Sequence, residues 1–158
     1  MKLHKCIYLI VVLSALIILG CGCKAGNDYK RSIYNDNSKI AEDADRYYFK
    51  FSSFNPEDKS VSIKFDDFIG MHTIWLVSAA EDGKLTVNYD SEIKEGKFKV
   101  VYVSPDKTVT DIFEGENSGS TIIEVPKGKG KIKIIGLDAE GSVDISLAME
   151  GRISVTKP

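Results

Sequence analysis

Few side chains in this sequence have the type and spacing that catalysis or metal binding requires. His72 is the only histidine beyond the first twenty residues, and without a second histidine or a nearby cysteine a transition-metal site would depend on carboxylates alone. The sequence contains neither a Gly-x-Ser-x-Gly nor a His-Glu-x-x-His motif. We therefore interpret His72 as a residue at the start of a buried strand, and we predict no catalytic residue, no cofactor and no transition-metal ligand.

Acidic residues form two groups, Asp66 with Asp67 and Asp138 with Glu140 and Asp144. Such groups can bind Ca²⁺ through oxygen ligands, although their spacing differs from that of an EF-hand loop. A carboxylate pair could also hydrolyse a glycoside, but no insertion that would form a cleft is recognisable. We interpret these residues as solvated loop residues, with a calcium site as the alternative.

Five aromatic residues are candidates for a platform on which sugars could stack: Tyr47, Tyr48, Trp75, Tyr89 and Tyr102. The alternation of apolar residues assigns Tyr47 and Tyr89 to the core, and Trp75 lies in a run that is apolar on both faces. Tyr48 is therefore the candidate that we expect to face outward and to make surface contacts.

A basic turn supplies the other candidate contacts, Lys127, Lys129 and Lys131. These lysines could bind an anionic wall polymer or lipid headgroups. Lysines at a strand edge also discourage aggregation between strands, and we regard that solvated-edge role as the simpler interpretation.

The N-terminus has the pattern of an export signal. Lys2 and Lys5 precede an apolar run, residues 7–19, which ends at Gly20-Cys21. This run is shorter than the roughly 20 residues that span a bilayer. The Gly20-Cys21 junction resembles the lipobox of bacterial lipoproteins. That resemblance implies a signal peptide over residues 1–20, lipid attachment at Cys21, and a lipid-anchored protein on the extracytoplasmic face of the cell membrane.

Composition limits the partners and the covalent constraints. Without residues 1–20 the chain loses two lysines from its 21 basic residues and keeps its 23 acidic ones, so its net charge changes from −2 to about −4. A nucleic-acid partner normally requires a basic face, so we exclude one. Cys23 would be the only cysteine left free, which excludes a disulfide within the chain. Residues 21–46 are polar and poorly periodic, which predicts a flexible linker, with a short helix over residues 38–46 as one alternative.

From residue 47 to residue 158 the hydrophobic period is two. Short alternating runs are separated by turn signals at residues 55–58, 81–84, 94–97, 104–107 and 116–119. Eight to ten strands at this spacing predict an all-β domain, an antiparallel two-sheet sandwich for which a jelly roll is one topology. Apolar residues keep one parity from Val143 to Val155, which predicts a single long strand bent at Gly151.

The segment from Gly130 to Leu147 is similar to the closing hairpin of secreted jelly-roll-like modules, such as bacterial pre-peptidase C-terminal domains. The whole chain also looks like a small lipoprotein of Gram-positive bacteria. These resemblances imply a non-catalytic binding or accessory module of the cell envelope, with an envelope protein or wall polysaccharide as the partner. A carbohydrate-binding module is the alternative, and a small envelope hydrolase is the third hypothesis.

Overall fold

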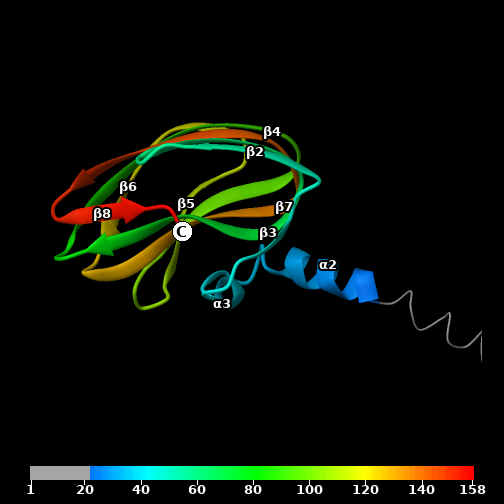
Figure 1. Cartoon of the computed structure of the whole chain (residues 1–158), viewed down its shortest axis with the longest axis horizontal. Coiled ribbons are helices and arrows are strands. Elements are labelled where there is room, and N and C mark those ends of the chain that lie inside the picture. Colours follow the sequence, from blue (N-terminus) through cyan, green and yellow to red (C-terminus); the bar gives the residue numbers. More distant parts are fainter. Residues whose placement is uncertain (1–21) are drawn as a thin grey trace, which may run out of the picture.

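The computed structural model describes residues 22–158, so the predicted signal peptide over residues 1–20 and the predicted lipid attachment at Cys21 lie outside the described residues. Figure 1 shows the order of the elements along the chain. They are α2 (Gly22–Ser32), α3 (Asn37–Ile40), β1 (Arg46–Tyr48), β2 (Phe51–Pro56), β3 (Ser60–Ala79), β4 (Gly83–Val103), β5 (Val109–Glu114), β6 (Asn117–Val125), β7 (Gly128–Glu150) and β8 (Ile153–Thr156). Within the described chain, neither helix has the length and apolar composition that crossing a bilayer would require.

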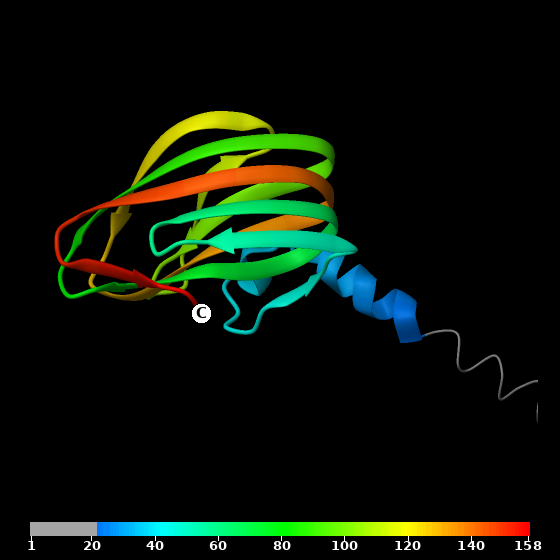
Figure 2. The ribbon, with the colours of Figure 1, turned by 45° about the horizontal axis from the view of Figure 1, so that its top comes forward.

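The strands form one antiparallel sheet that is folded over into two layers. β3, β7 and β4 lie side by side in its centre, and each is at least 20 residues long. Figure 2 shows the long ribbons curving together on the side from which α2 leaves. The first layer contains β2, β6, the first halves of β3 and β4, and the second half of β7. The second layer contains β1, β5, β8 and the other halves. The predicted all-β class with antiparallel strands is thus confirmed, and the two predicted layers belong to one folded sheet.

The bend between the layers depends on irregular backbone in each long strand. The pairing of β3 with β7 shifts register between Phe65 and Gly70, and that of β4 with β7 shifts between Ile93 and Lys97. Gly96 has a φ of 72° at this bend, and a Cβ atom there would lie 2.1 Å from the backbone oxygen of Asp138. The turn signal at residues 94–97 therefore marks a bend inside a continuous strand, and the sequence prediction of a turn there is wrong.

The main core fills the space between the two layers. The rings of Phe65 and Phe98, which come from opposite sides of the bend, stack at 4.8 Å between centroids. Trp75 is buried, as predicted. Tyr89 is partly buried against this core, and its ring stacks on that of Phe113 at 4.1 Å. Because each long strand contributes to both layers, burial of this core also keeps the two layers packed against each other.

Residues 33–45, here called the strap, cover the outer face of the second layer. Ile33 and Ile40 are fully buried there, in a second cluster that includes Met71, Val101 and Ile135 from the sheet. The prediction of a flexible linker over residues 21–46 is therefore wrong for the strap, since a few apolar side chains are enough to pack it against an apolar sheet face. α3 begins after Asp36, whose side chain accepts from two backbone N–H groups at the start of the helix.

The C-terminus changes layer where one continuous strand was predicted. β7 ends at Glu150, which pairs with Lys84 in the first layer, and β8 begins at Ile153, which pairs with Ala79 in the second. Gly151, with a φ of 96°, lies in the turn between them. The parity of the apolar residues continues through the turn because both strands direct that face into the same core. Parity therefore could not distinguish a bend from a change of layer.

Candidate functional site

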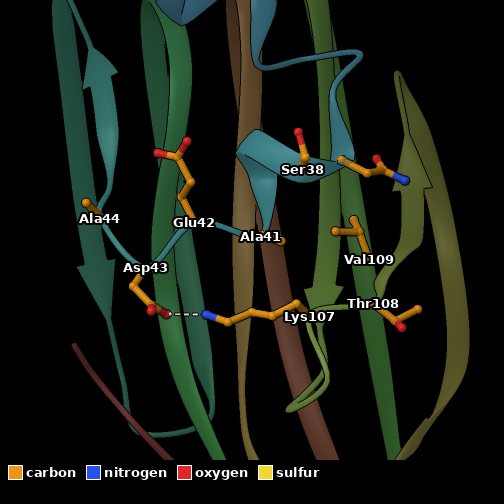
Figure 3. Close-up of a pocket in the computed structure, with 9 residues that line it drawn as sticks. Ser38, Ala41, Glu42, Asp43, Ala44, Lys107, Thr108 and Val109 are labelled. Atoms are coloured by element: carbon orange, nitrogen blue, oxygen red, sulfur yellow. Dashed lines mark hydrogen bonds and ion pairs between the residues drawn. The ribbon is translucent and has the colours of Figure 1, made fainter.

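Two grooves border the strap. The one with the larger volume lies between the strap and the turn before β5. This strap groove has a volume of about 890 Å³. Figure 3 shows the side chains that line it, which include Asp43, Lys107 and Val109, with the Lys107 ammonium directed at the Asp43 carboxylate. None of its lining residues is aromatic. It offers hydroxyl, amide and charged groups without an apolar ring against which a ligand could stack.

Two of the charged residues at the strap groove, Asp43 and Lys107, are paired with each other. Asp43 accepts from the Nζ of Lys107 at 2.7 Å and from the Nζ of Lys131 at 3.1 Å. These two ammonium groups lower the pKa of the Asp43 carboxyl to about 2. Lys131 also donates to the backbone oxygen of Asp43 at 3.2 Å. Lys131 therefore holds the strap on the sheet, whereas Lys127 and Lys129 of the same basic turn are exposed. The structure separates the three lysines that the sequence grouped.

The second groove lies between α2 and β1 and has a volume of about 420 Å³. Its lining residues, which define the tyrosine groove, are Gly26, Tyr29, Lys30, Asp45, Arg46 and Tyr47. Tyr29 and Tyr47 are 37% and 43% exposed. Two exposed aromatic residues next to acidic and basic groups are what a ligand with an apolar face and polar edges requires.

Both rings of the tyrosine groove are held by neighbours. The ring of Tyr47 contacts those of His72 and Phe49, at centroid distances of 4.6 and 5.2 Å. The hydroxyl of Tyr29 donates to Glu42 at 3.0 Å, and Glu42 also accepts from the Nε of Arg46 at 3.4 Å. The guanidinium of Arg46 lies 5.4 Å from the Tyr29 ring centroid. These contacts place the rings before a ligand arrives, which reduces the entropy lost on binding.

Asp45 anchors the floor of the tyrosine groove. Its carboxylate accepts from the backbone N–H and the hydroxyl of Thr73 at 2.8 and 2.7 Å, and the Nδ1 of His72 lies 3.3 Å away. Burial would raise the pKa of Asp45, but the nearby His72 and the hydrogen bonds from Thr73 outweigh it and lower that pKa to about 2. His72 therefore packs within β3 and supports the groove, in a position later in the strand than the sequence predicted.

The outcome for Tyr47 is a correction. Alternation assigned it to the core, but it is exposed and lines the tyrosine groove. Its partner across the strand pair is Gly70, which has no side chain to cover the ring. The prediction for Tyr48 is confirmed as far as exposure goes, because 44% of it is exposed. It lies outside the groove lining, and the Lys30 Nζ is 6.0 Å from its ring centroid.

Four of the five acidic residues considered for calcium are paired with separate partners, and Asp67 is the fifth. Asp66 pairs with Lys50, Glu140 pairs with Lys94, and Asp138 forms two hydrogen bonds with Arg31. Asp144 accepts from the hydroxyl of Ser62. Among residues 22–158, no three histidine, cysteine or carboxylate side chains converge as metal ligands would.

Sequence reasoning missed the groove residues Tyr29, Lys30, Asp45 and Arg46, and Glu42 beside them, because all five lie in the segment interpreted as a linker. The available signal was the order Tyr29, Ile33, Tyr34 and Ile40, an apolar series at nearly helical spacing within the polar tract. Recognising that series would have indicated that the tract packs on the domain.

No protein-family model and no curated protein matches this chain. Among solved structures, the unliganded CBM1 of BiXyn10A is similar over 71% of this chain and 92% of its own, with 12% identity and a TM-score of 0.40. A family 29 carbohydrate-binding module variant complexed with mannohexaose covers 73% and 83%, with 12% identity and a TM-score of 0.41. CBM35 from Cellvibrio japonicus Abf62 covers 70% and 80%, with 9% identity and a TM-score of 0.37. Similarity at this level does not identify a ligand, which has to follow from the residues of this chain.

Proposed function

We propose that this chain is a lipid-anchored, extracytoplasmic and non-catalytic module that binds a carbohydrate in the tyrosine groove. The observation that carries the proposal is the position of Tyr29 and Tyr47, both exposed, on one groove with Arg46, Lys30 and Asp45. The C–H face of a sugar ring packs on an aromatic ring, and its hydroxyls pair with charged side chains. Stacked rings and polar groups together supply both affinity and orientation.

The size of the groove favours a ligand of a few sugar units. Pockets for small ligands usually measure about 300–1,000 Å³, and the tyrosine groove falls within that range at about 420 Å³. Within residues 22–158 the Lys30 ammonium at its rim lies 6.0 Å from the Tyr48 ring centroid and forms no ion pair like that of Arg46, so it can serve an acidic substituent. A wall polysaccharide is therefore the polymer class that we expect.

A glycan array followed by calorimetry with the full chain tests this function. We expect binding to a wall-derived oligosaccharide that weakens about tenfold in Tyr47→Ala, which corresponds to about 1.4 kcal/mol of binding free energy. Tyr48→Ala is the matched control, because Tyr48 is the next residue, is equally exposed and lies outside the groove lining. Absence of any glycan binding, or equal losses in the two variants, would contradict the proposal.

The membrane anchor is a separate part of the proposal and depends on the Gly20-Cys21 junction. Two acyl chains hold a protein stably at a bilayer, whereas a single chain does so only marginally. Radioactive palmitate should label the wild-type chain, and Cys21→Ser should remain unlabelled and leave the membrane fraction. A Cys23→Ser control should behave like the wild type. An unlabelled wild-type chain would remove the anchor without affecting the proposed glycan site.

The other envelope role, in which a protein is the partner, would use the strap groove. None of its lining residues has an aromatic ring on which a sugar could stack, and Asp43 and Lys107 already pair with each other, so a polypeptide is the ligand that we expect there. The glycan experiment discriminates between the two roles, since a protein-binding module would be silent on the array and unaffected by Tyr47→Ala.

A further inference from the structure

β6 forms an open edge of the first layer. It pairs with β4 along its whole length, from Asn117 opposite Ser91 to Val125 opposite Gly83. Figure 2 shows it as the outermost ribbon of that layer, at the top of the view. Within the described chain no other strand pairs with β6. One row of its backbone N–H and C=O groups is therefore available to a further strand.

This edge has few of the features that usually prevent pairing between molecules. β6 is nine residues long and pairs with β4 without a register shift, and its one charged residue is Glu124, near the Pro126 that follows the strand. The other edge strands differ. β2 ends in Pro56, and β5 has only six residues and pairs with β4 across a bulge. Short strands, prolines and bulges protect a sheet edge, so β6 is the least protected one.

An exposed apolar side chain lies in the middle of β6. Ile122 is 65% exposed, more than any other large hydrophobic residue of the described chain. Its cross-strand neighbour is Thr86, and the next residue in that row is Ala148. Both are small, so the isoleucine is left uncovered on the outer face. A partner strand that placed an apolar side chain beside it would remove this surface from water.

We propose that the occupant is a second copy of this chain, whose β6 pairs antiparallel with the first around a two-fold axis at Ile122. In that register the two Ile122 side chains face each other, and Ser120 of each copy lies opposite Glu124 of the other. Lys127 follows Pro126 just beyond the end of β6, and this register brings it near Asn117 and Glu116 at the start of the other copy's strand. No like charges face each other along the pairing, and a lysine lies near an acidic residue beyond each of its ends.

The dimer joins two first layers into one continuous sheet and leaves both tyrosine grooves open. β1, which lines the groove, pairs with β3 at one end of the strand order, whereas β6 pairs with β4 towards the other end. Two grooves on one particle would bind a polysaccharide with two sites, and linked sites raise the overall affinity for a polymer. The dimer itself does not depend on the proposed glycan function.

Cysteine cross-linking of the full chain in membranes tests the dimer. Mild oxidation of Ile122→Cys should give several-fold more covalent dimer than the wild type, whose own cysteines set the background. Ala148→Cys is the matched control, because it is exposed on the same face but lies in β7, away from the edge. It should remain at background. Equal cross-linking in both variants, no dimer in Ile122→Cys, or cross-linking to a different protein would overturn the proposal.

Sedimentation of the purified full chain in detergent provides a second measurement. The wild type should dimerise as its concentration rises, and Ile122→Lys should remain monomeric, because a lysine at the two-fold axis places like charges opposite each other. Ile122 is mostly exposed, so the variant should keep the circular dichroism spectrum of the wild type. A wild-type chain that stays monomeric, or an Ile122→Lys chain that still dimerises, would overturn the proposal.

Discussion

Lys133 and Asp45 form an ion pair beneath the strap, with 3.9 Å between Nζ and Oδ1. Lys133 is fully buried, and its Nζ also donates to the backbone oxygen of Glu42 at 2.6 Å. Burial lowers the pKa of Lys133, and the nearby Asp45 opposes that effect. The sheet thus holds the strap, and with it Arg46 and Tyr47 of the tyrosine groove, through a cation that has no access to water.

Loss of Asp45 should therefore destabilise the protein strongly. Asp45→Ala leaves the buried Lys133 ammonium without its carboxylate, and breaking a buried pair in this way costs about 3 kcal/mol of unfolding free energy. Urea unfolding of the full chain measures it. Asp43→Ala is the control, since Asp43 also pairs with two lysines but its side chain is 76% exposed. The decrease in unfolding free energy caused by Asp43→Ala should therefore be much smaller. Equal effects of the two substitutions would show that burial is not the cause.

The stabilisation from Asp45 should depend on pH. Its pKa is lowered from 3.8 to about 2 in the folded chain, so its contribution is complete above about pH 5 and is lost as the pH falls through about 4 towards 2. The shift corresponds to about 2 kcal/mol at most. The difference in unfolding free energy between wild type and Asp45→Asn should therefore shrink between pH 6 and pH 2.5. A difference that stays constant with pH would contradict the assignment.

The bend of the long strands should tolerate no side chain at Gly96. Gly96 and Gly115 both have a φ of 72°, but a Cβ on Gly96 would lie 2.1 Å from the Asp138 oxygen, whereas a Cβ on Gly115 meets nothing within 4 Å. Gly115→Ala should cost about 1 kcal/mol from backbone strain alone. Gly96→Ala should cost about 3 kcal/mol or more, because the two strands must also move apart. Thermal unfolding of both variants measures the difference, and similar melting temperatures would count against this account of the bend.

The C-terminal end of α2 should depend on Arg31. Its guanidinium donates two hydrogen bonds to Asp138, at 2.6 and 3.1 Å. Arg31→Ala should expose α2 to limited proteolysis while the sheet remains resistant. Arg152→Ala is the matched control. Arg152 lies in the turn between β7 and β8, away from α2, and its guanidinium donates the same kind of two hydrogen bonds to Glu81, between β3 and β4. Cleavage of α2 at the same rate in both variants would indicate that Arg31 does not hold the helix.

The class of the fold could be predicted because alternation is a local property of the sequence. Val143, Ile145 and Leu147 direct one parity into the core in both the prediction and the structure. The folding of one sheet into two layers could not be predicted, since a register shift such as that between Ile93 and Lys97 depends on contacts far away in the chain. Parity also gave no indication that β8 changes layer, because β7 and β8 direct residues of the same parity into one core.

The candidate site was harder to predict than the fold. The tyrosine groove forms where a segment of polar composition packs on the sheet, and all of its lining residues except Tyr47 come from that segment. Tyr47 follows the alternation of a core strand, but all three residues of β1 are exposed, and Gly70 opposite Tyr47 has no side chain to cover its ring. Exposure of this kind depends on what the neighbouring strands provide, which a single segment of sequence does not reveal.

The most direct test of the central claim is an NMR titration of the full chain, with labelled tyrosines, against soluble oligosaccharides cut from bacterial cell wall. If the oligosaccharide binds in the tyrosine groove, we expect saturable shifts of the Tyr29 and Tyr47 ring signals. The signals of Tyr48 and the buried Tyr102 should remain unchanged. Ring signals of Tyr29 and Tyr47 that stay constant while the oligosaccharide binds elsewhere, or that never respond to any wall sugar, would contradict it.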